Sequence, residues 1–583
     1  MILRIALVAL ALQAGSLRVM AESSSLTWWV TNPLVKIKAL DPAPAYPAKN
    51  VELSAGRNEF EPFQIVLRSD GKDIPDLDVE FSDFRSQDGA EISKSRITIY
   101  LEQFLDVTHP STMESIAGLW PDPLIPRVDR YANEKRNAFP FTVRRGRNQP
   151  LWVDVFIPDS AAPGKYTGSA RVTRGKTTEF RVPIRLTVWA FVLPSTSALR
   201  SSFGLNGTTL VKQHRGKYTD DDDLYSLTKL YAKAALLHRI SIHGGSMVGP
   251  KYYYHRGDMQ IDWKSYDAEV GPFLNGTVMS PDDPLQGAKA TSVELRTPAT
   301  FPSDKQEAAY WASWMKHFEE NKWSDRLFLY LWDEPTTPDF PKVLQRGRAA
   351  LKANPRIHNL VTIPFAKQLA EVVQIWTPLV NCLERKPDYA DFCADAPTMD
   401  SYAGEIQHGK SLWFYQSCAS HGCNIPGGEY FNGWPSYMID APATANRVMQ
   451  WIAWKYRIQG ELYFSMDEAY GRGKDPWLDV RLVGGNGDGT LFYPGRPDRI
   501  GGHTDIPIES IRLKLIREGM EDHEYLTLLE KLAGSKAAEE FADQIAKKPY
   551  LWESRPEAFL LVRRELGGTL DRLTVLAHGS GAH

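Results

Sequence analysis

The feature that most constrains the fold is a regular alternation of short β-like runs with amphipathic stretches from Ser201 onward. This alternation is typical of a parallel α/β fold. Helices are expected around 224–238 and 307–321. Eight β-like runs fit the pattern: 201–206, 240–245, 291–296, 326–334, 359–365, 378–384, 411–417 and 461–468. Eight such strands predict a (β/α)8 TIM-like barrel, whose active site lies at the carboxyl ends of the strands.

The chain has a different character before Pro194. Short β-like runs with alternating apolar residues are separated by Gly and Pro, as at 60–69, 95–104, 149–158 and 181–191. This pattern predicts an antiparallel β-sandwich. We therefore expect a sandwich domain over 22–194, followed over 195–583 by the barrel and a C-terminal helical segment.

The first residues predict export. Arg4 precedes an apolar stretch, and Val19 and Ala21 are small residues before a cleavage point, which is the pattern of a secretory signal peptide over 1–21. Gln13, Ser16 and Arg18 interrupt the apolar run, so it is too short for a membrane span. A secreted or periplasmic protein without a membrane span is expected.

Composition excludes several classes of protein. The formal net charge is -3, with 43% hydrophobic and 24% charged residues, so neither disorder nor a nucleic-acid footprint is indicated. The 17 Trp and 24 Tyr include enough rings to stack on sugar faces, although large cores also contain Trp.

Four cysteines fall within one short segment: Cys382, Cys393, Cys418 and Cys423. An exported protein meets oxidising conditions, so two local disulfides are expected. Sequence proximity favours pairing Cys382 with Cys393 and Cys418 with Cys423 among the three possible connectivities. A zinc site is the alternative, but the spacings are wider than CxxC pairs. No metal and no cofactor are predicted.

The stretch LYLWDEPTTPD, residues 329–339, places Asp333 and Glu334 where a β-like run meets Pro335. One interpretation is a helix start with Asp333 as a capping acid. The other is a catalytic carboxylate pair at the mouth of the barrel. The predicted topology puts both acids at the carboxyl end of strand four, which favours the second interpretation.

Other polar residues end neighbouring predicted strands, and these are Asn206, His243, Glu384, Tyr415, Gln416, Asp467 and Glu468. For each of these residues, a structural role is the alternative to a role in the site. His243 could be a turn residue, Glu384 a surface acid beside Lys386, and Asp467 a loop cap.

Two further motifs are interpreted as structural. GNGDGTLFYPG, residues 485–495, lacks the Lys and the helix entry of a phosphate loop, and a tight loop on the active-site side after strand eight is predicted. REGMEDHEY, residues 517–525, places Arg517 and Glu521 four residues apart, which indicates a helix-packing charge network.

Several stretches resemble a known family: AGRNEFEPFQIVLRS, LWPDPLIP, PLWVDVFIPDSAAPGKYTG, LYLWDEP, GNGDGTLFYPG and SIRLKLIREGMEDHEYL. They are similar to the domain-of-unknown-function family 4091, which is related to glycoside hydrolase family 123. The resemblance runs from about Asn58 to Tyr525. It implies a retaining exo-β-N-acetylhexosaminidase-like enzyme, of the β-N-acetylgalactosaminidase type, with a catalytic Asp-Glu pair that matches Asp333 and Glu334.

Adjacent carboxylates suit a substrate-assisted reaction, in which the 2-acetamido carbonyl of the sugar attacks its own anomeric carbon. Glu334 would protonate the leaving oxygen, and Asp333 would orient the acetamido N–H. The acetamido methyl group would need an aromatic pocket. Its candidate walls lie at or just beyond the ends of strands seven and eight: Trp413, Tyr415, Trp434 and Tyr463.

Two other functions stay open. One is a conventional glycosidase on a sugar without an acetamido group, with Glu334 as acid and Asp467, Glu468 or Glu384 opposite it. The other is a non-catalytic carbohydrate-binding protein. A carbohydrate partner is expected in every case, and the oligomeric state is left undetermined.

Overall fold

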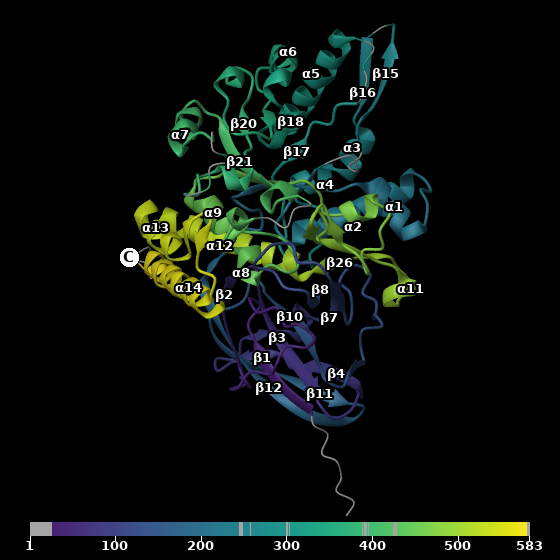
Figure 1. The fold of residues 1–583 in the computed structure, drawn as a ribbon, viewed down its shortest axis with the longest axis vertical. Coiled ribbons are helices and arrows are strands. Elements are labelled where there is room, and N and C mark those ends of the chain that lie inside the picture. The colour runs from purple at the N-terminus through teal and green to yellow at the C-terminus, as the bar shows by residue number, and fades with distance from the viewer. Residues whose placement is uncertain are drawn as a thin grey trace, which may run out of the picture.

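The computed structural model describes residues 26–243, 249–256, 258–298, 301, 303–387, 389, 393, 396–423 and 428–579. A β-sandwich forms one end of the molecule, and a barrel forms the other (Figure 1). The C-terminal helices lie at the junction of the two, in yellow in Figure 1. The predicted signal peptide lies outside the described residues.

The sandwich consists of two sheets. The first has the order β1 (Leu26–Thr31), β3 (Glu59–Ser69), β10 (Arg147–Ile157), β7 (Ile97–Val107), β8 (Gly118–Pro126), β26 (Ile506–Ser510) and β25 (Phe492–Gly495). The second has the order β2 (Val51–Arg57), β12 (Thr177–Val192), β11 (Gly164–Arg174), β4 (Ile74–Phe81) and β9 (Phe141–Val143), with β5 (Phe84–Ser86) and β6 (Glu91–Ile92) beside β11.

The four sandwich strands predicted from the sequence are present as β3, β7, β10 and β12. Their alternate residues, such as Leu151, Val153 and Val155 of β10, point into a common apolar core. The pairs are antiparallel, as predicted, except that β2 and β12 run parallel.

Two strands of the first sheet come from the chain that follows the barrel. β26 pairs with β8, and β25 pairs with β26. The prediction of a loop over 485–495 is therefore wrong for its second half, because Phe492–Gly495 is strand β25. These apolar residues extend the sandwich sheet and tie the end of the barrel to it.

The barrel sheet has eight strands, in the order β14 (Ile242–His243), β13 (Arg200–Gly204), β22 (Gly460–Tyr463), β21 (Ser411–Gln416), β20 (Ile375–Trp376), β19 (Asn359–Val361), β18 (Leu327–Trp332) and β17 (Val293–Glu294). All neighbouring pairs are parallel. The two end strands, β14 and β17, pack beside each other. The predicted TIM-like barrel is thus confirmed as a nearly closed sheet.

One predicted barrel strand is misplaced. The sixth strand is β20 at Ile375–Trp376, whereas the predicted segment 378–384 contains a 3-10 turn at Val380–Cys382. Val380 and Leu383 are buried all the same. A short apolar run indicates burial rather than extended backbone, which explains the error.

Helices cover the barrel and fill the junction with the sandwich. The predicted helices are present as α2 (Asp221–Leu237) and α5 (Asp304–Glu320). The other helices are α1 (Gly207–Arg215), α3 (Lys264–Glu269), α4 (Gly271–Asn275), α6 (Phe340–Ala353), α7 (Met399–Gln407), α8 (Ala443–Arg447), α9 (Met449–Lys455), α10 (Glu468–Gly471), α11 (Pro497–Ile500), α12 (Ile511–Ala533), α13 (Ser535–Ile545) and α14 (Pro556–Gly579). Short two-stranded ribbons are β15 (Lys251–His255) with β16 (Asp258–Asp262), β23 (Arg481–Leu482) with β24 (Gly485–Asn486), and β27 (Ala546–Lys548) with β28 (Leu551–Trp552).

Helix α12 carries buried charges at the junction. The Arg517 guanidinium donates to both oxygens of Asp154 on β10, at 3.0 and 2.9 Å, and also contacts Glu518. Glu521 instead accepts from Arg239, at 3.2 Å. The prediction of a helix-packing charge network is confirmed, but its partners lie across the junction rather than four residues along the helix.

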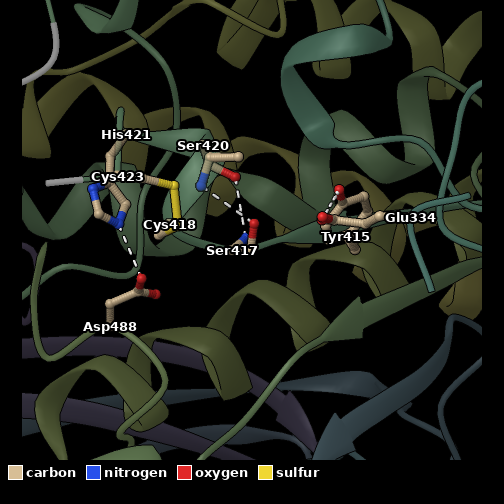
Figure 2. The surroundings of a disulfide bond; sticks show 9 residues. Glu334, Tyr415, Ser417, Cys418, Ser420, His421, Cys423 and Asp488 are labelled. Carbon is tan, nitrogen blue, oxygen red and sulfur yellow. Dashed lines mark hydrogen bonds and ion pairs between the residues drawn. A yellow bond between two sulfur atoms is a disulfide. The ribbon is translucent and has the colours of Figure 1, made fainter. Parts of the chain in front are cut away.

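Both predicted disulfides form. Cys382 bonds to Cys393, and Cys418 bonds to Cys423. The second bridge closes the turn that follows β21, as Figure 2 shows.

Candidate active site

Strand β18 presents Asp333 and Glu334 at the mouth of the barrel. Its pairing with β19 shifts register between Tyr330 and Trp332, and Glu334 has a φ of 42°. A bulge and a left-handed residue both re-aim the side chains around them. Two consecutive carboxylates therefore both reach partners at the mouth instead of alternating between the two faces of the sheet. Both side chains are exposed.

The helix-start interpretation of Asp333 does not match the contacts. The Thr336 amide and hydroxyl both donate to Oδ2 of Asp339, at 2.9 and 2.6 Å, just before α6 begins. Asp339 therefore stabilises the 3-10 turn Thr337–Asp339 that leads into α6. The Asp333 carboxylate contacts other strands instead.

One oxygen of Asp333 accepts two hydrogen bonds. Tyr330 donates its hydroxyl to Oδ1 at 2.8 Å, and the Thr362 hydroxyl donates to the same atom at 3.0 Å. Burial and the nearby Asp333 carboxylate raise the pKa of Tyr330, so its hydroxyl keeps its proton. Within the described part of the chain, Oδ2 of Asp333 accepts no hydrogen bond, so this oxygen is available to a ligand.

Glu334 contacts β21, which is separated from β18 by β20 and β19 in the barrel sheet. Tyr415, on β21, donates its hydroxyl to Oε1 of Glu334 at 2.6 Å (Figure 2). Burial, followed by this hydrogen bond, raises the pKa of Tyr415 well above the ordinary value. Each carboxylate thus has its own tyrosine, and the two tyrosines come from different strands.

His243 lies on the same side as Asp333. It ends β14, its ring stacks on Tyr330 with centroids 6.4 Å apart, and its Nδ1 lies 3.0 Å from the Ser202 hydroxyl. Burial lowers the pKa of His243, while the Glu294 and Asp333 carboxylates oppose that shift. The ring is therefore neutral near pH 7, and it borders the site as a hydrogen-bonding group.

Asn206 and Asp467 lie together but serve the scaffold. The Asn206 side chain caps α1 by accepting from the amides of Thr208 and Thr209. Asp467 is buried and accepts from the Asn206 amide at 3.1 Å and from the Thr209 hydroxyl at 2.7 Å. Burial raises the pKa of Asp467 to about 7 against the effect of those hydrogen bonds.

All four predicted aromatic walls are buried, and three of them make their contacts away from the carboxylate pair. Trp413 is 1% exposed and packs on Phe328 within the barrel. Tyr463 is fully buried and accepts the Gly489 amide at 2.8 Å. Trp434 is 4% exposed and donates its Nε1–H to the carbonyl of Tyr430. Tyr415 alone among the four reaches the carboxylate pair.

Two residues of the site were missed from the sequence, Tyr330 and Thr362. Tyr330 is three residues before Asp333 on the same strand, and the register shift brings its hydroxyl back to the carboxylate. Thr362 directly follows β19, so its place at a strand end was a usable signal. In the described part of the chain, no group of three or more His, Cys, Asp or Glu side chains is arranged to hold a metal ion.

A nearly closed barrel with a carboxylate pair at the carboxyl ends of its strands can support glycoside hydrolysis, which commonly uses two carboxyl groups. The sequence agrees, because residues 295–529 match the glycoside hydrolase 123 catalytic domain and residues 37–174 match the glycoside hydrolase 123 N-terminal domain. The chain belongs to glycoside hydrolase family 123.

One solved structure of the same family shares this fold, and other glycoside hydrolases show weaker similarity. A family 123 glycoside hydrolase from Clostridium perfringens, studied for glycolipid glycan hydrolysis, is 14% identical, with a TM-score of 0.68 over 94% of this chain and 98% of that chain. A GH5 xyloglucanase from Bacteroides ovatus is 9% identical over 81% of this chain and 98% of that chain, with a TM-score of 0.26. A family 39 glycoside hydrolase from Bacteroides cellulosilyticus is 12% identical over 73% and 77%, with a TM-score of 0.28. No curated protein matches the sequence.

Proposed function

We propose that this glycoside hydrolase is a retaining exo-β-N-acetylhexosaminidase that favours β-linked N-acetylgalactosamine. One observation carries the proposal: the two candidate catalytic carboxylates are consecutive residues that each bind a tyrosine at one mouth. In a common retaining glycosidase, the acid and the nucleophile flank the sugar from separate positions about 5 Å apart. Consecutive residues suit a reaction in which the substrate supplies its own nucleophile.

The first step of the proposed reaction forms a cyclic intermediate. Glu334 gives its proton to the glycosidic oxygen, the bond from that oxygen to the anomeric carbon breaks, and the acetamido carbonyl oxygen bonds to the anomeric carbon. Oδ2 of Asp333 accepts the acetamido N–H and stabilises the positive charge of the oxazolinium ion. Oδ1 is already held by Tyr330 and Thr362, so the carboxylate does not need to reorient.

The second step restores the enzyme. Water attacks the anomeric carbon from the side that the leaving group vacated, Glu334 accepts its proton, and the bond to the acetamido oxygen breaks. The sugar is released with its original anomeric configuration. Tyr415 donates its only hydroxyl hydrogen to Glu334, so we assign it to holding this carboxyl group rather than the sugar. We infer that His243, which stacks on Tyr330, binds a sugar hydroxyl.

The other carboxylates proposed as partners of Glu334 have structural contacts. Asp467 is buried beneath the start of α1. Glu384 accepts from Tyr456 and Lys548, and Glu468 pairs with Arg472 at 3.0 Å. These contacts count against a conventional two-carboxylate mechanism.

The proposal extends to the substrate and the compartment. The Clostridium perfringens relative acts on glycolipid glycans, and we take the terminal sugar of such a glycan as the substrate class. Export is supported by the signal-peptide pattern and by the two disulfides. Within the described residues, no helix combines the length and apolarity needed to cross a membrane.

A panel of aryl glycosides tests the proposal. We expect release from β-N-acetylgalactosaminide, less from β-N-acetylglucosaminide, and none from β-galactoside or arabinofuranoside. A thiazoline mimic of the oxazolinium ion should bind tightly, because only an acetamido-dependent site is complementary to it. Turnover of β-galactoside without inhibition by the thiazoline would contradict the proposal.

A further inference from the structure

Thr362 contacts both residues of the carboxylate pair, although it is not itself exposed at the mouth. It directly follows β19 and is 2% exposed. Its Oγ1 accepts the Glu334 backbone N–H at 2.7 Å and lies 3.0 Å from Oδ1 of Asp333. One hydroxyl at the end of the neighbouring strand therefore bridges the two consecutive residues that follow β18.

The chemistry of the groups fixes the direction of both hydrogen bonds. A backbone N–H only donates, so Thr362 accepts from Glu334. A carboxylate only accepts when it is ionised, so the hydrogen of the Thr362 hydroxyl points to Asp333. The resulting chain runs from the Glu334 amide through the hydroxyl to the Asp333 carboxylate, and each bond polarises the next.

We propose that Thr362 is a positioning residue that sets the geometry of both carboxylates at once, an inference that rests on the proposed function of Asp333 and Glu334. The left-handed backbone at Glu334, with φ of 42°, is unfavourable for a residue with a side chain and needs support from its surroundings. The hydrogen bond from the Glu334 amide supplies it. The bond to Oδ1 holds the carboxylate so that Oδ2 faces the acetamido N–H.

This role predicts an effect on turnover rather than on substrate binding. Small displacements of reacting groups lower the rate of the chemical step strongly, because both carboxylates must be in place before the sugar reaches its transition state. Removing the hydroxyl should therefore lower kcat by roughly 10- to 100-fold and change KM little. If Thr362 only supported the fold, removing its hydroxyl would lower the melting temperature instead.

The experiment compares Thr362→Val, which removes the hydroxyl, with Thr362→Ser, which keeps it. The matched control is Thr377→Val. Thr377 is also buried, directly follows the next strand, β20, and its hydroxyl has no hydrogen-bond partner in the described part of the chain. We expect Thr362→Val to lose turnover, and we expect Thr362→Ser and Thr377→Val to stay within about twofold of the natural protein by the same argument. Equal turnover of Thr362→Val and Thr377→Val would overturn the inference, as would an equal loss in Thr362→Ser.

Two further measurements keep the test decisive. If Thr362→Val does not fold, Thr362→Ala replaces it and should show the same loss of kcat, whereas Thr362→Ser should keep nearly full turnover. In an Asp333→Ala background, Thr362→Val should lower kcat by a smaller factor than in the natural protein, because one group that Thr362 positions is gone. An equal cost there would show that the hydroxyl does not act through Asp333.

The outcome is separable from that of the proposed function. The glycoside panel on the natural protein decides whether an acetamido sugar is the substrate, before any variant is made. All Thr362 variants are then assayed on whichever aryl glycoside the natural protein hydrolyses fastest. The positioning role is contradicted when Thr362→Val keeps full turnover on that substrate, whatever its sugar.

Discussion

Acidic side chains meet two different environments in this protein. At the junction of sandwich and barrel, buried acids pair with arginines: Asp522 accepts from Arg447 at 2.7 and 2.8 Å and from Arg563 at 2.9 Å. At the mouth of the barrel, Asp333 and Glu334 are exposed and accept from neutral hydroxyl groups. No lysine or arginine of the described chain forms an ion pair with either of them.

The difference matches the proposed division between structural carboxylates at the junction and catalytic ones at the mouth. Buried charges require partners to offset the cost of desolvation, and each arginine at the junction is committed in return. A carboxylate that must give up a proton or stabilise a developing charge needs a free oxygen and no permanent cation. Hydroxyl groups from tyrosine and threonine orient such a carboxylate without neutralising it.

The largest expected effect is at the mouth. Glu334→Gln should lower turnover of substrates with poor leaving groups by about 10²–10⁴-fold, because these need a proton from the acid. Activated aryl glycosides should be affected much less. Steady-state kinetics on one substrate of each kind measures the difference, and equal losses would show that Glu334 is not the acid.

Arg517→Met tests the junction. The change leaves Asp154 with Lys514 as its only buried cationic contact, at 2.8 Å, among the described residues. Breaking a buried ion pair from one side should lower the free energy of unfolding by about 3–5 kcal/mol. Denaturant titration measures this loss, and kcat should be unchanged where the variant is folded. A loss of turnover without a loss of stability would remove the distinction between the two regions.

Asp333→Asn keeps the shape of the side chain and removes its charge. We expect unchanged melting temperature and a loss of turnover of about 10²–10³-fold, by analogy with the loss of one preorganised stabilising group. The matched control is Asp339→Ala, which removes one side of the capping box of the 3-10 turn before α6 and should cost about 1 kcal/mol of stability while turnover stays intact. Near-normal turnover of Asp333→Asn on the true substrate would contradict a catalytic role.

Glu461 sharpens the comparison, because it is buried in the barrel and its hydrogen-bond donors, Tyr437 and Gln450, are both neutral. Burial raises the pKa of Glu461 to about 7. Between about pH 4.5 and 7 the folded protein keeps a proton that the unfolded chain releases, so stability falls as pH rises through this window. Above pH 7 both forms are ionised and the dependence ends.

Glu461→Gln should remove this fall. The free energy of unfolding of the variant minus that of the natural protein should therefore increase by about 3 kcal/mol between pH 4.5 and pH 7.5. Glu539→Gln, at an exposed position on α13, is the control and should leave the pH dependence unchanged. Parallel pH curves for Glu461→Gln and the natural protein would contradict the assigned pKa.

Local pattern in the sequence determined most of the architecture. Alternating apolar residues predicted β3, β7, β10 and β12, and the βα alternation predicted the barrel, because both periods follow from how a strand or a helix presents one face to a core. Proximity along the chain was enough for the disulfides. The position of Asp333 and Glu334 at a strand end also followed from the sequence, because parallel strands end at one face.

Only the tertiary structure decided which side chains meet these acids. Tyr330 reaches Asp333 through a register shift, and Thr362 and Tyr415 come from strands that are distant in sequence. Trp413, which the sequence marks as a candidate pocket wall, packs inside the barrel. Which face of a strand is buried depends on register and on closure of the sheet, and both are set by contacts between segments far apart in the chain.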